Sequence, residues 1–257
     1  MEIIKNLYNY RELLTTSVNK DVGGKYKNSF LGVLWSFLNP LLQIAIYAIV
    51  FPLILRNNQE NYVIFLCCGL IPWNFFATAI NRSAFSFVEN GNIIKKVYFP
   101  REILPISTAT SGLVNFLIST PIILMFLLFS GIGFSKYILF LPVIAIIQYL
   151  LTLAIIMITS AINVYIRDAE YIINFFVTML FYATPVLYSA DLFPKQFRQF
   201  LYLNPMTTII NGYRDIFYYK QMPDYLALGI VFIISILLLL LGFKIFRKLE
   251  KGFAEEV

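Results

Sequence analysis

The chain has 257 residues, of which 59% are hydrophobic and 13% are charged, and its formal net charge is +6. Soluble domains carry about 25% charged residues, so the composition excludes an ordinary soluble domain and indicates a protein of the lipid bilayer. The sequence contains no histidine, which excludes a histidine metal site and a histidine general base.

Residues 1–27 precede the apolar runs and predict an amphipathic helix. Their apolar side chains recur at helical spacing, with the charged side chains off that stripe: Ile3, Leu7, Tyr10, Leu14 and Val18. Such a helix lies in the plane of the inner membrane surface. The alternative, a helix packed on a soluble domain, is disfavoured because no soluble domain remains. The first 30 residues show no cleavable signal peptide.

Long apolar segments follow in order along the chain. A transmembrane helix needs roughly 20 mainly apolar residues, and backbone groups in lipid must be satisfied within the segment. We therefore expect an all-α integral membrane fold, with a single domain over residues 1–257. Its six transmembrane helices are predicted at 34–55, 62–82, 104–130, 137–162, 171–190 and 226–246.

Lysine and arginine are distributed unevenly among the connecting segments. If the N-terminus lies inside, the inner segments hold most of these cations, whereas the short outer loops hold only Arg56 and Lys136. Cytoplasmic loops are enriched in Lys and Arg, so both termini are expected in the cytoplasm. The positive net charge then reflects topology, and nothing indicates nucleic acid.

The segment NIIKKVYFPREILP, residues 92–105, joins the second and third spans. It carries a basic flank that includes Lys95 and Lys96, and Ile93, Ile94 and Val97 give it one apolar helical turn. The pattern favours a short helix displayed to the cytoplasm with a face for docking. The alternative is a cytoplasmic loop that has no docking role and is basic only because cytoplasmic loops are enriched in Lys and Arg.

Residues 191–224 form the long segment between the fifth and sixth spans. They are too apolar for a solvated loop and too often interrupted for a plain span. Because the residue before a proline is pushed out of the helical region, Asn204-Pro205 predicts a hinge between two short helices. Backbone of this kind at membrane depth must be buried or line a cavity, which favours a re-entrant outer gate. A lipid-facing amphipathic hairpin is the alternative.

The spans carry almost no ionisable side chain, which disfavours a proton-coupled secondary transporter; sodium coupling through backbone carbonyls stays open. No carboxylate pair has the spacing of a transferase or hydrolase site, and Asp168 and Glu170 fit a helix N-terminus.

Gly23-Gly24-Lys25 is followed by Tyr26, so it is not a phosphate-binding loop. We predict no catalytic, metal or cofactor site in the chain.

Aromatic residues are abundant, and some fall in the middle of predicted spans. A tyrosine hydroxyl in hydrocarbon needs a hydrogen-bond partner, so Tyr47 and Tyr182 would suit the lining of a water-filled transport path. Aromatic faces, including those of Phe75 and Phe76, are also suitable surfaces for sugar rings. Lipid-facing aromatic side chains are the simpler alternative.

Four blocks of the chain together resemble the type-2 ATP-binding-cassette export permeases. They are KYKNSFLGVLWSFLNPLLQIAIYAIVF, NIIKKVYFPREILP, YIRDAEYI with YATPVLYS downstream, and LYLNPMTTIINGYRD. The resemblance covers nearly the whole chain in order. It is strongest to the branch that exports lipid-linked O-antigen, capsular polysaccharide and teichoic acid, and these motifs do not separate polysaccharide from polyol-phosphate substrates.

The resemblance implies roles for three segments. Residues 1–27 would be the interface helix, and residues 87–99 would hold a coupling helix, at about Phe87–Lys96, that docks into a separate ATPase subunit. Residues 194–219 would be the outer gate helices, with Asn204, Pro205, Tyr213 and Arg214 as gate residues. The implied ATPase-coupling residues are Glu89, Asn90, Asn92, Ile93, Lys95 and Lys96.

The resemblance further implies a homodimer of permeases with two ATPase subunits, which supply ATP and Mg²⁺, in the bacterial cytoplasmic (inner) membrane. Spans one, two and five would line the path, with Tyr47, Phe75, Phe76 and Tyr182 as lining residues. A lipid-linked glycan would enter from the inner leaflet. Its pyrophosphate would be attracted by Arg11, Lys20, Lys25 and Lys27, although surface anchoring explains these cations equally well.

Other functions remain as alternatives. A type-2 exporter of drugs or small lipids would share the fold and the ATPase. A secondary transporter or channel would work without any ATPase, and a membrane-bound transferase is the least favoured because no acid–base cluster is visible.

Overall fold

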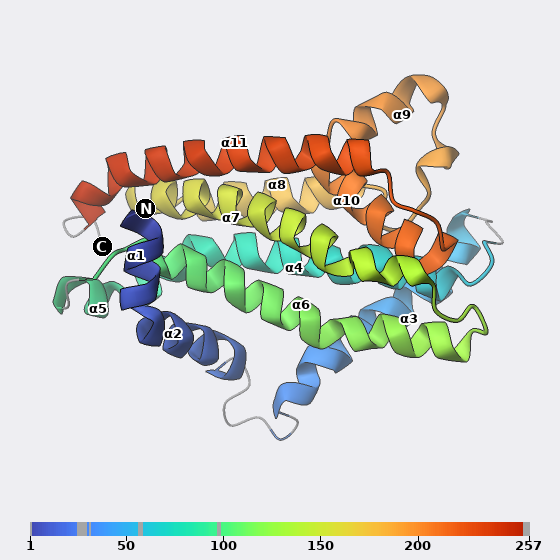
Figure 1. Cartoon of the computed structure of the whole chain (residues 1–257), viewed down its shortest axis with the longest axis horizontal. Coiled ribbons are helices and arrows are strands. Elements are labelled where there is room, and N and C mark those ends of the chain that lie inside the picture. The colour runs from blue at the N-terminus through green and yellow to red at the C-terminus, as the bar shows by residue number, and fades with distance from the viewer. Residues whose placement is uncertain (1, 25–29, 31, 56–58, 97–98, 254–257) are drawn as a thin grey trace.

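The computed structural model describes residues 2–24, 30, 32–55, 59–96 and 99–253, and the regular elements in these residues are all helices. Figure 1 shows an elongated bundle of long helices lying side by side. Five helical segments of the described chain are long and apolar enough to cross a membrane, which confirms the all-α integral membrane fold. They contain α3 (Trp35–Leu55), α4 (Tyr62–Glu89), α6 (Ile103–Phe129), α7 (Leu141–Tyr165) and α11 (Tyr225–Leu249).

α4 lies at the centre of the bundle. It packs against α3, α6, α7, α8 and α10. Two buried amides of α7 bind its backbone, because Gln148 Nε2 donates to the Pro72 carbonyl at 2.7 Å and Asn163 Nδ2 donates to the Ala84 carbonyl at 2.7 Å. A polar side chain without a partner is costly in hydrocarbon, so these contacts favour one register of α7 against α4.

Two predicted spans have wrong boundaries. The predicted span 62–82 ends too early, since α4 continues to Glu89 and is capped at Asn90. The predicted span 171–190 ends too late: the helix here, α8 (Ala169–Ala183), has 15 residues. Thr184 precedes Pro185 and is extended, with ψ 136°, because a residue before proline disfavours the helical region.

The N-terminal segment forms two helices, α1 (Glu2–Asn9) and α2 (Arg11–Gly24), so the prediction of one continuous helix is wrong for its described residues. α2 packs against α6, and Leu7, Tyr10 and Leu14 of the predicted apolar stripe contact the protein core. Part of the stripe therefore binds the membrane domain itself.

The two ends of the bundle differ. Figure 1 shows α1, α5 (Gly91–Lys96) and the last turn of α11 at one end, and α9 (Lys195–Tyr202) at the other. The prediction that the N- and C-terminal elements lie on one side of the membrane fits this arrangement. We call it the inner end, because the positive-inside rule predicts that this side faces the cytoplasm.

Candidate functional site

The inner end presents α5, a helix of six residues. The predicted coupling helix starts too early, because Phe87 is buried within α4, Glu89 is the last residue of α4, and Asn90 caps it. Asn92 and Ile93 belong to α5, but their side chains lie outside the described part of the structure.

The side chains of α5 that are described separate into two groups. Ile94 is 6% exposed and packs into the core, whereas Lys95 and Lys96 in the last turn are exposed. Ile94 thus fixes the helix to the bundle, and the two lysines are available to a partner.

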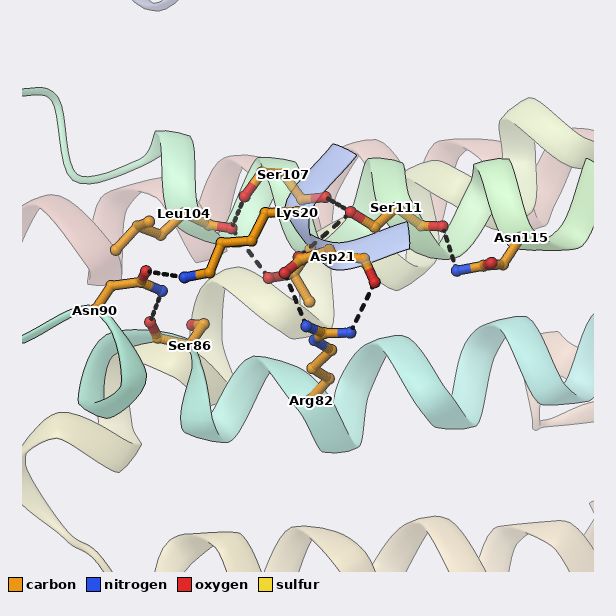
Figure 2. Close-up of polar contacts among 10 residues, drawn as sticks. Lys20, Asp21, Arg82, Ser86, Asn90, Leu104, Ser107, Ser111 and Asn115 are labelled. Atoms are coloured by element: carbon orange, nitrogen blue, oxygen red, sulfur yellow. Dashed lines mark hydrogen bonds and ion pairs between the residues drawn. The ribbon is translucent and has the colours of Figure 1, made fainter. Parts of the chain in front are cut away.

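A polar junction joins α2 to α4 and α6 next to α5 (Figure 2). The Asp21 carboxylate accepts from Arg82 Nη2 at 2.8 Å and from Ser111 Oγ at 3.3 Å. The neighbouring Lys20 donates from Nζ to Asn90 Oδ1 at 3.2 Å, and Asn90 Nδ2 donates to the Ser86 carbonyl at 2.7 Å. The predicted headgroup ligand Lys20 therefore contacts the residue that caps α4 immediately before α5.

The segment that follows α5 is fastened to the bundle at a second place. Arg101 Nη1 donates to the Glu250 carbonyl, and its guanidinium lies over the Phe253 ring. Asn6 Nδ2 donates to Glu102 Oε1 at 3.2 Å. Asn90 and Arg101 thus hold the chain before and after α5 against α2, α4 and the turn that follows α11.

The other predicted headgroup ligands give less information. The exposed Arg11 donates to the Tyr8 carbonyl at 3.2 Å, and its guanidinium lies 4.9 Å from the Tyr8 ring centroid. Lys25 and Lys27 lie outside the described residues. The four predicted cations are not brought together as one described site.

The predicted path residues lie on two faces of α4. Tyr47 of α3 and the exposed Tyr182 of α8 both contact the Phe181 ring. Phe76 joins the same aromatic cluster through Trp73, which contacts both Phe76 and Phe181. The cluster links the three helices predicted to line the path.

Phe75 points to the other side of α4, where its ring packs against Phe116 of α6. It lines a groove of about 360 Å³ between α3, α4 and α6. Lining residues recur at three- and four-residue spacing on each helix, which places them on one helical face. The polar ones are Ser36, Asn39, Gln43, Asn74, Thr78, Asn115 and Ser119.

The sequence analysis did not predict this groove, because it considered ionisable and aromatic side chains within the spans but not Ser, Thr, Asn and Gln. The signal was present as neutral polar side chains at helical spacing: Ser36, Asn39 and Gln43 follow each other by three and four positions, and Asn115 and Ser119 by four. We call this feature the amide groove.

At the outer end, α9 and α10 (Pro205–Arg214) are separated at the predicted hinge, and a π-helical turn (Asp215–Tyr219) follows. Asn204 caps α10, since its Oδ1 accepts from Met206 N at 3.0 Å, and its Nδ2 donates to Thr184 Oγ1 at 2.7 Å. In the π-helical turn, burial raises the pKa of Asp215, against the opposing hydrogen bond from Gln221.

The predicted gate residues Tyr213 and Arg214 are fully buried. Tyr213 donates to Gln148 Oε1 at 2.9 Å. Arg214 Nη2 donates to the Val186 carbonyl at 2.7 Å, and its guanidinium lies 3.6 Å from the Phe65 ring centroid. They anchor α10 to α4 and α7, whereas α9 exposes Phe200 and is the more loosely held helix.

No group of three or more His, Cys, Asp or Glu side chains in the described residues could hold a metal ion.

Residues 12–218 match the membrane-domain model of the ABC-2 type transporters. The chain belongs to this family. It is 38% identical to the O-antigen export system permease protein RfbA of Klebsiella pneumoniae over 95% of this chain and 94% of that protein. It is 34% identical to the protein of the same name from Myxococcus xanthus over the full length of both chains.

A more distant relative is the polysialic acid transport protein KpsM of Escherichia coli, at 23% identity over 89% of each chain. The family is that of the ABC-2 membrane permeases, so the chain is a transport component of the membrane.

Proposed function

We propose that the chain is the membrane permease of an ATP-driven exporter that moves a lipid-linked polysaccharide across the bacterial inner membrane. The observation that carries this proposal is the identity of 38% and 34%, over nearly the whole chain, to two permeases named for O-antigen export. The more distant relative is also named for transport of a glycan polymer. A drug or small-lipid exporter is not favoured by any of these three relatives.

A separate ATPase subunit, in two copies, binds the inner end at α5. The ATPase binds ATP and Mg²⁺ and hydrolyses the ATP. The exposure of Lys95 and Lys96 on a helix anchored through Ile94 supports this site. The lysines meet an acidic surface on the ATPase, and complementary charge of this kind steers association and fixes the docking register.

Movement of α5 is transmitted to the spans through the contacts that flank it. The Lys20–Asn90 hydrogen bond and the Asp21–Arg82 ion pair carry the displacement to α2 and α4. Arg101 carries it to the inner end of α11. Closure of the ATPase dimer on ATP would thereby change the spacing of the inner halves of the spans.

The permease works as a homodimer. α3 supports this because its outer half exposes a row of large apolar side chains, Ile46, Ile49, Val50, Leu53 and Ile54. The aromatic cluster of Tyr47, Phe76 and Tyr182 then lies beside the path between the copies, and α9 and α10 close its outer mouth.

Deletion of the gene in its native host tests the function directly. We expect loss of the surface polysaccharide, accumulation of the lipid-linked polymer in the inner membrane, and restoration of both by the intact chain. Normal surface polysaccharide in the deletion strain would contradict the proposal. Acquired sensitivity to small toxic compounds, with unchanged polysaccharide, would favour a drug exporter.

A further inference from the structure

The amide groove lies deep in the part of the bundle that crosses the membrane. Asn74 follows the first residue of α4, Tyr62, by 12 positions, and Asn115 follows the first residue of α6, Ile103, by 12 positions. At 1.5 Å per residue these distances are on the order of 18 Å along each helix. Neutral polar groups at this depth are costly unless they find partners, and they mark functional sites in membrane proteins.

Some of the polar groups of the groove are satisfied within the protein. Asn74 Nδ2 donates to Gln43 Oε1 at 2.8 Å, which joins α4 to α3. Ser119 Oγ donates to the Asn115 carbonyl at 2.9 Å, and Asn115 Nδ2 donates to the Ser111 carbonyl at 3.0 Å. These bonds hold the amides in fixed orientations and leave other atoms free to meet a ligand.

Two buried atoms of the groove have no hydrogen-bond partner among the described residues: Ser36 Oγ and Asn115 Oδ1. Ser36 is only 7% exposed. A hydroxyl is both a donor and an acceptor, and an amide oxygen is an acceptor. Sugar hydroxyls can satisfy both atoms, because each hydroxyl can donate to Asn115 Oδ1 and can either donate to or accept from Ser36 Oγ.

The groove is also uncharged, because Asp, Glu, Lys and Arg are absent from the described residues that line it. A phosphate or an acidic sugar would be buried there without a counter-charge, which is strongly unfavourable. Trp35, Phe75 and Phe116 add aromatic walls, and the negative ring face attracts the C–H side of a sugar ring.

Gly112 of α6 lets one of these walls form. A Cβ atom at this position would lie 2.9 Å from the Phe75 ring, so a side chain would push the ring away from α6. The glycine thus permits the close approach of Phe75 that shapes the groove.

We infer that the amide groove is a binding site, within a single copy of the chain, for an uncharged sugar unit of the exported polymer. The inference rests on the proposed function, since it names the chemical group that the permease recognises. It assigns Ser36 and Asn115 as ligand contacts and Trp35 and Phe75 as walls, separately from the aromatic cluster on the other face of α4.

The test measures binding to the full chain in lipid nanodiscs. Trp35 and Trp73 are the two tryptophans of the sequence, so in a Trp73→Phe background the fluorescence reports on the groove through Trp35. The probes are the methyl glycosides of glucose, galactose, mannose and rhamnose, with glucuronate and glucose 1-phosphate as charged counterparts. We expect a saturable change with at least one neutral glycoside and none with the charged probes.

A pair of matched variants separates ligand contact from structure. Ser36→Ala removes an unpaired hydroxyl, so folded stability should be unchanged or higher, while the neutral glycoside binds roughly fivefold more weakly. Ser235→Ala makes the same change at a buried serine of α11 whose hydroxyl is bonded to the Val231 carbonyl at 2.7 Å, and binding should be unchanged. No saturable response to any neutral glycoside, equal binding by Ser36→Ala, or tighter binding of a charged probe would overturn the inference.

Export in the native host distinguishes this inference from the proposed function. If deletion of the gene abolishes surface polysaccharide and Asn115→Leu slows its appearance, both stand. If deletion abolishes it but Ser36→Ala and Asn115→Leu export at the normal rate, the groove inference fails and the proposed function stands. If deletion leaves the polysaccharide unchanged, the proposed function fails.

Discussion

α3 and α4 have the same mean hydropathy, 2.0 over their most apolar windows, yet 78% of the α4 window is buried and only 6% of the α3 window. Hydropathy therefore identifies both as membrane helices but does not show which one forms the core. α4 packs against six other α-helices, whereas α3 packs mainly against α4 and α6. The exposed face of α3 is available to lipid or to a second copy.

The polar side chains of the two helices also lie in different places. The inner half of α3 contributes Ser36 and Gln43 to the amide groove, while its outer half is apolar and exposed. α4 carries Asn74 in the groove and Arg82 in the junction with α2. A substitution in α4 should therefore disturb folding, and one on the exposed face of α3 should disturb association at most.

The sharpest form of this comparison is Leu66→Ala in α4 against Leu53→Ala in α3. Leu66 is 0% exposed and Leu53 is 76% exposed. The first should lower the free energy of unfolding by about 2–5 kcal/mol because it leaves a cavity, and the second should change it by less than about 0.5 kcal/mol. Equal losses in SDS titrations of the purified chain would contradict the central position of α4.

A glycine pair extends the test to the contact between α4 and the turn after α8. A Cβ at Gly69 would lie 2.6 Å from the Val186 carbonyl oxygen, whereas a Cβ at Gly229 of α11 meets nothing within 4 Å. Gly69→Ala should lower the free energy of unfolding by about 1–3 kcal/mol through overpacking. Gly229→Ala should be neutral or stabilising by up to about 1 kcal/mol. The melting temperatures of the two variants should diverge, and a Gly69→Ala variant as stable as Gly229→Ala would refute the close packing.

The junction between α2 and α4 should give a smaller effect. Asp21→Asn weakens the ion pair with Arg82, whose side chain is 32% exposed, so we expect a loss of about 1 kcal/mol. Glu12→Gln on the exposed face of α2 is the control. The exchange Asp21→Arg with Arg82→Asp should recover part of the export lost by either single change, and no recovery would argue against a direct pair.

At the outer hinge the expected effect on stability is no larger than at the junction. Replacing Asn204 and Pro205 by alanine removes the cap of α10, at a cost of about 1 kcal/mol, and should give ion leak or stalled export. Asp224→Ala removes a comparable cap, at the start of α11, and should cause no ion leak. If both variants leak equally, or neither does, the α9–α10 segment is not a gate.

Much of the fold follows from the sequence. Long apolar runs predicted α3 and α6 within one residue at each end. The end of α4 could not be placed because Arg82 and Glu89 suggested an aqueous boundary, whereas Arg82 is paired with Asp21 and lets the helix continue. Thr184-Pro185 signals a break in the helix, but the apolar run continues past it, so hydropathy alone predicts a full-length span.

The site was less predictable. The exposure of Lys95 and Lys96 follows from their charge, but their attachment through Asn90 and Arg101 depends on tertiary contacts. The periodicity of Ser36 and Asn115 with their neighbours was readable, but their meeting in one groove depends on how α3, α4 and α6 pack.

The most direct test of the account is a mild-detergent purification of the tagged chain from its native membranes, in wild-type form and with Lys95→Glu and Lys96→Glu together. Lys244→Glu with Lys248→Glu is the control, since both lysines are exposed near the inner end of α11. We expect a stoichiometric subunit with a phosphate-binding lysine loop in the wild type and the control, and its loss from the α5 variant, which stays folded. A folded wild-type chain that repeatedly purifies alone, or an α5 variant that keeps its ATPase, would contradict the account.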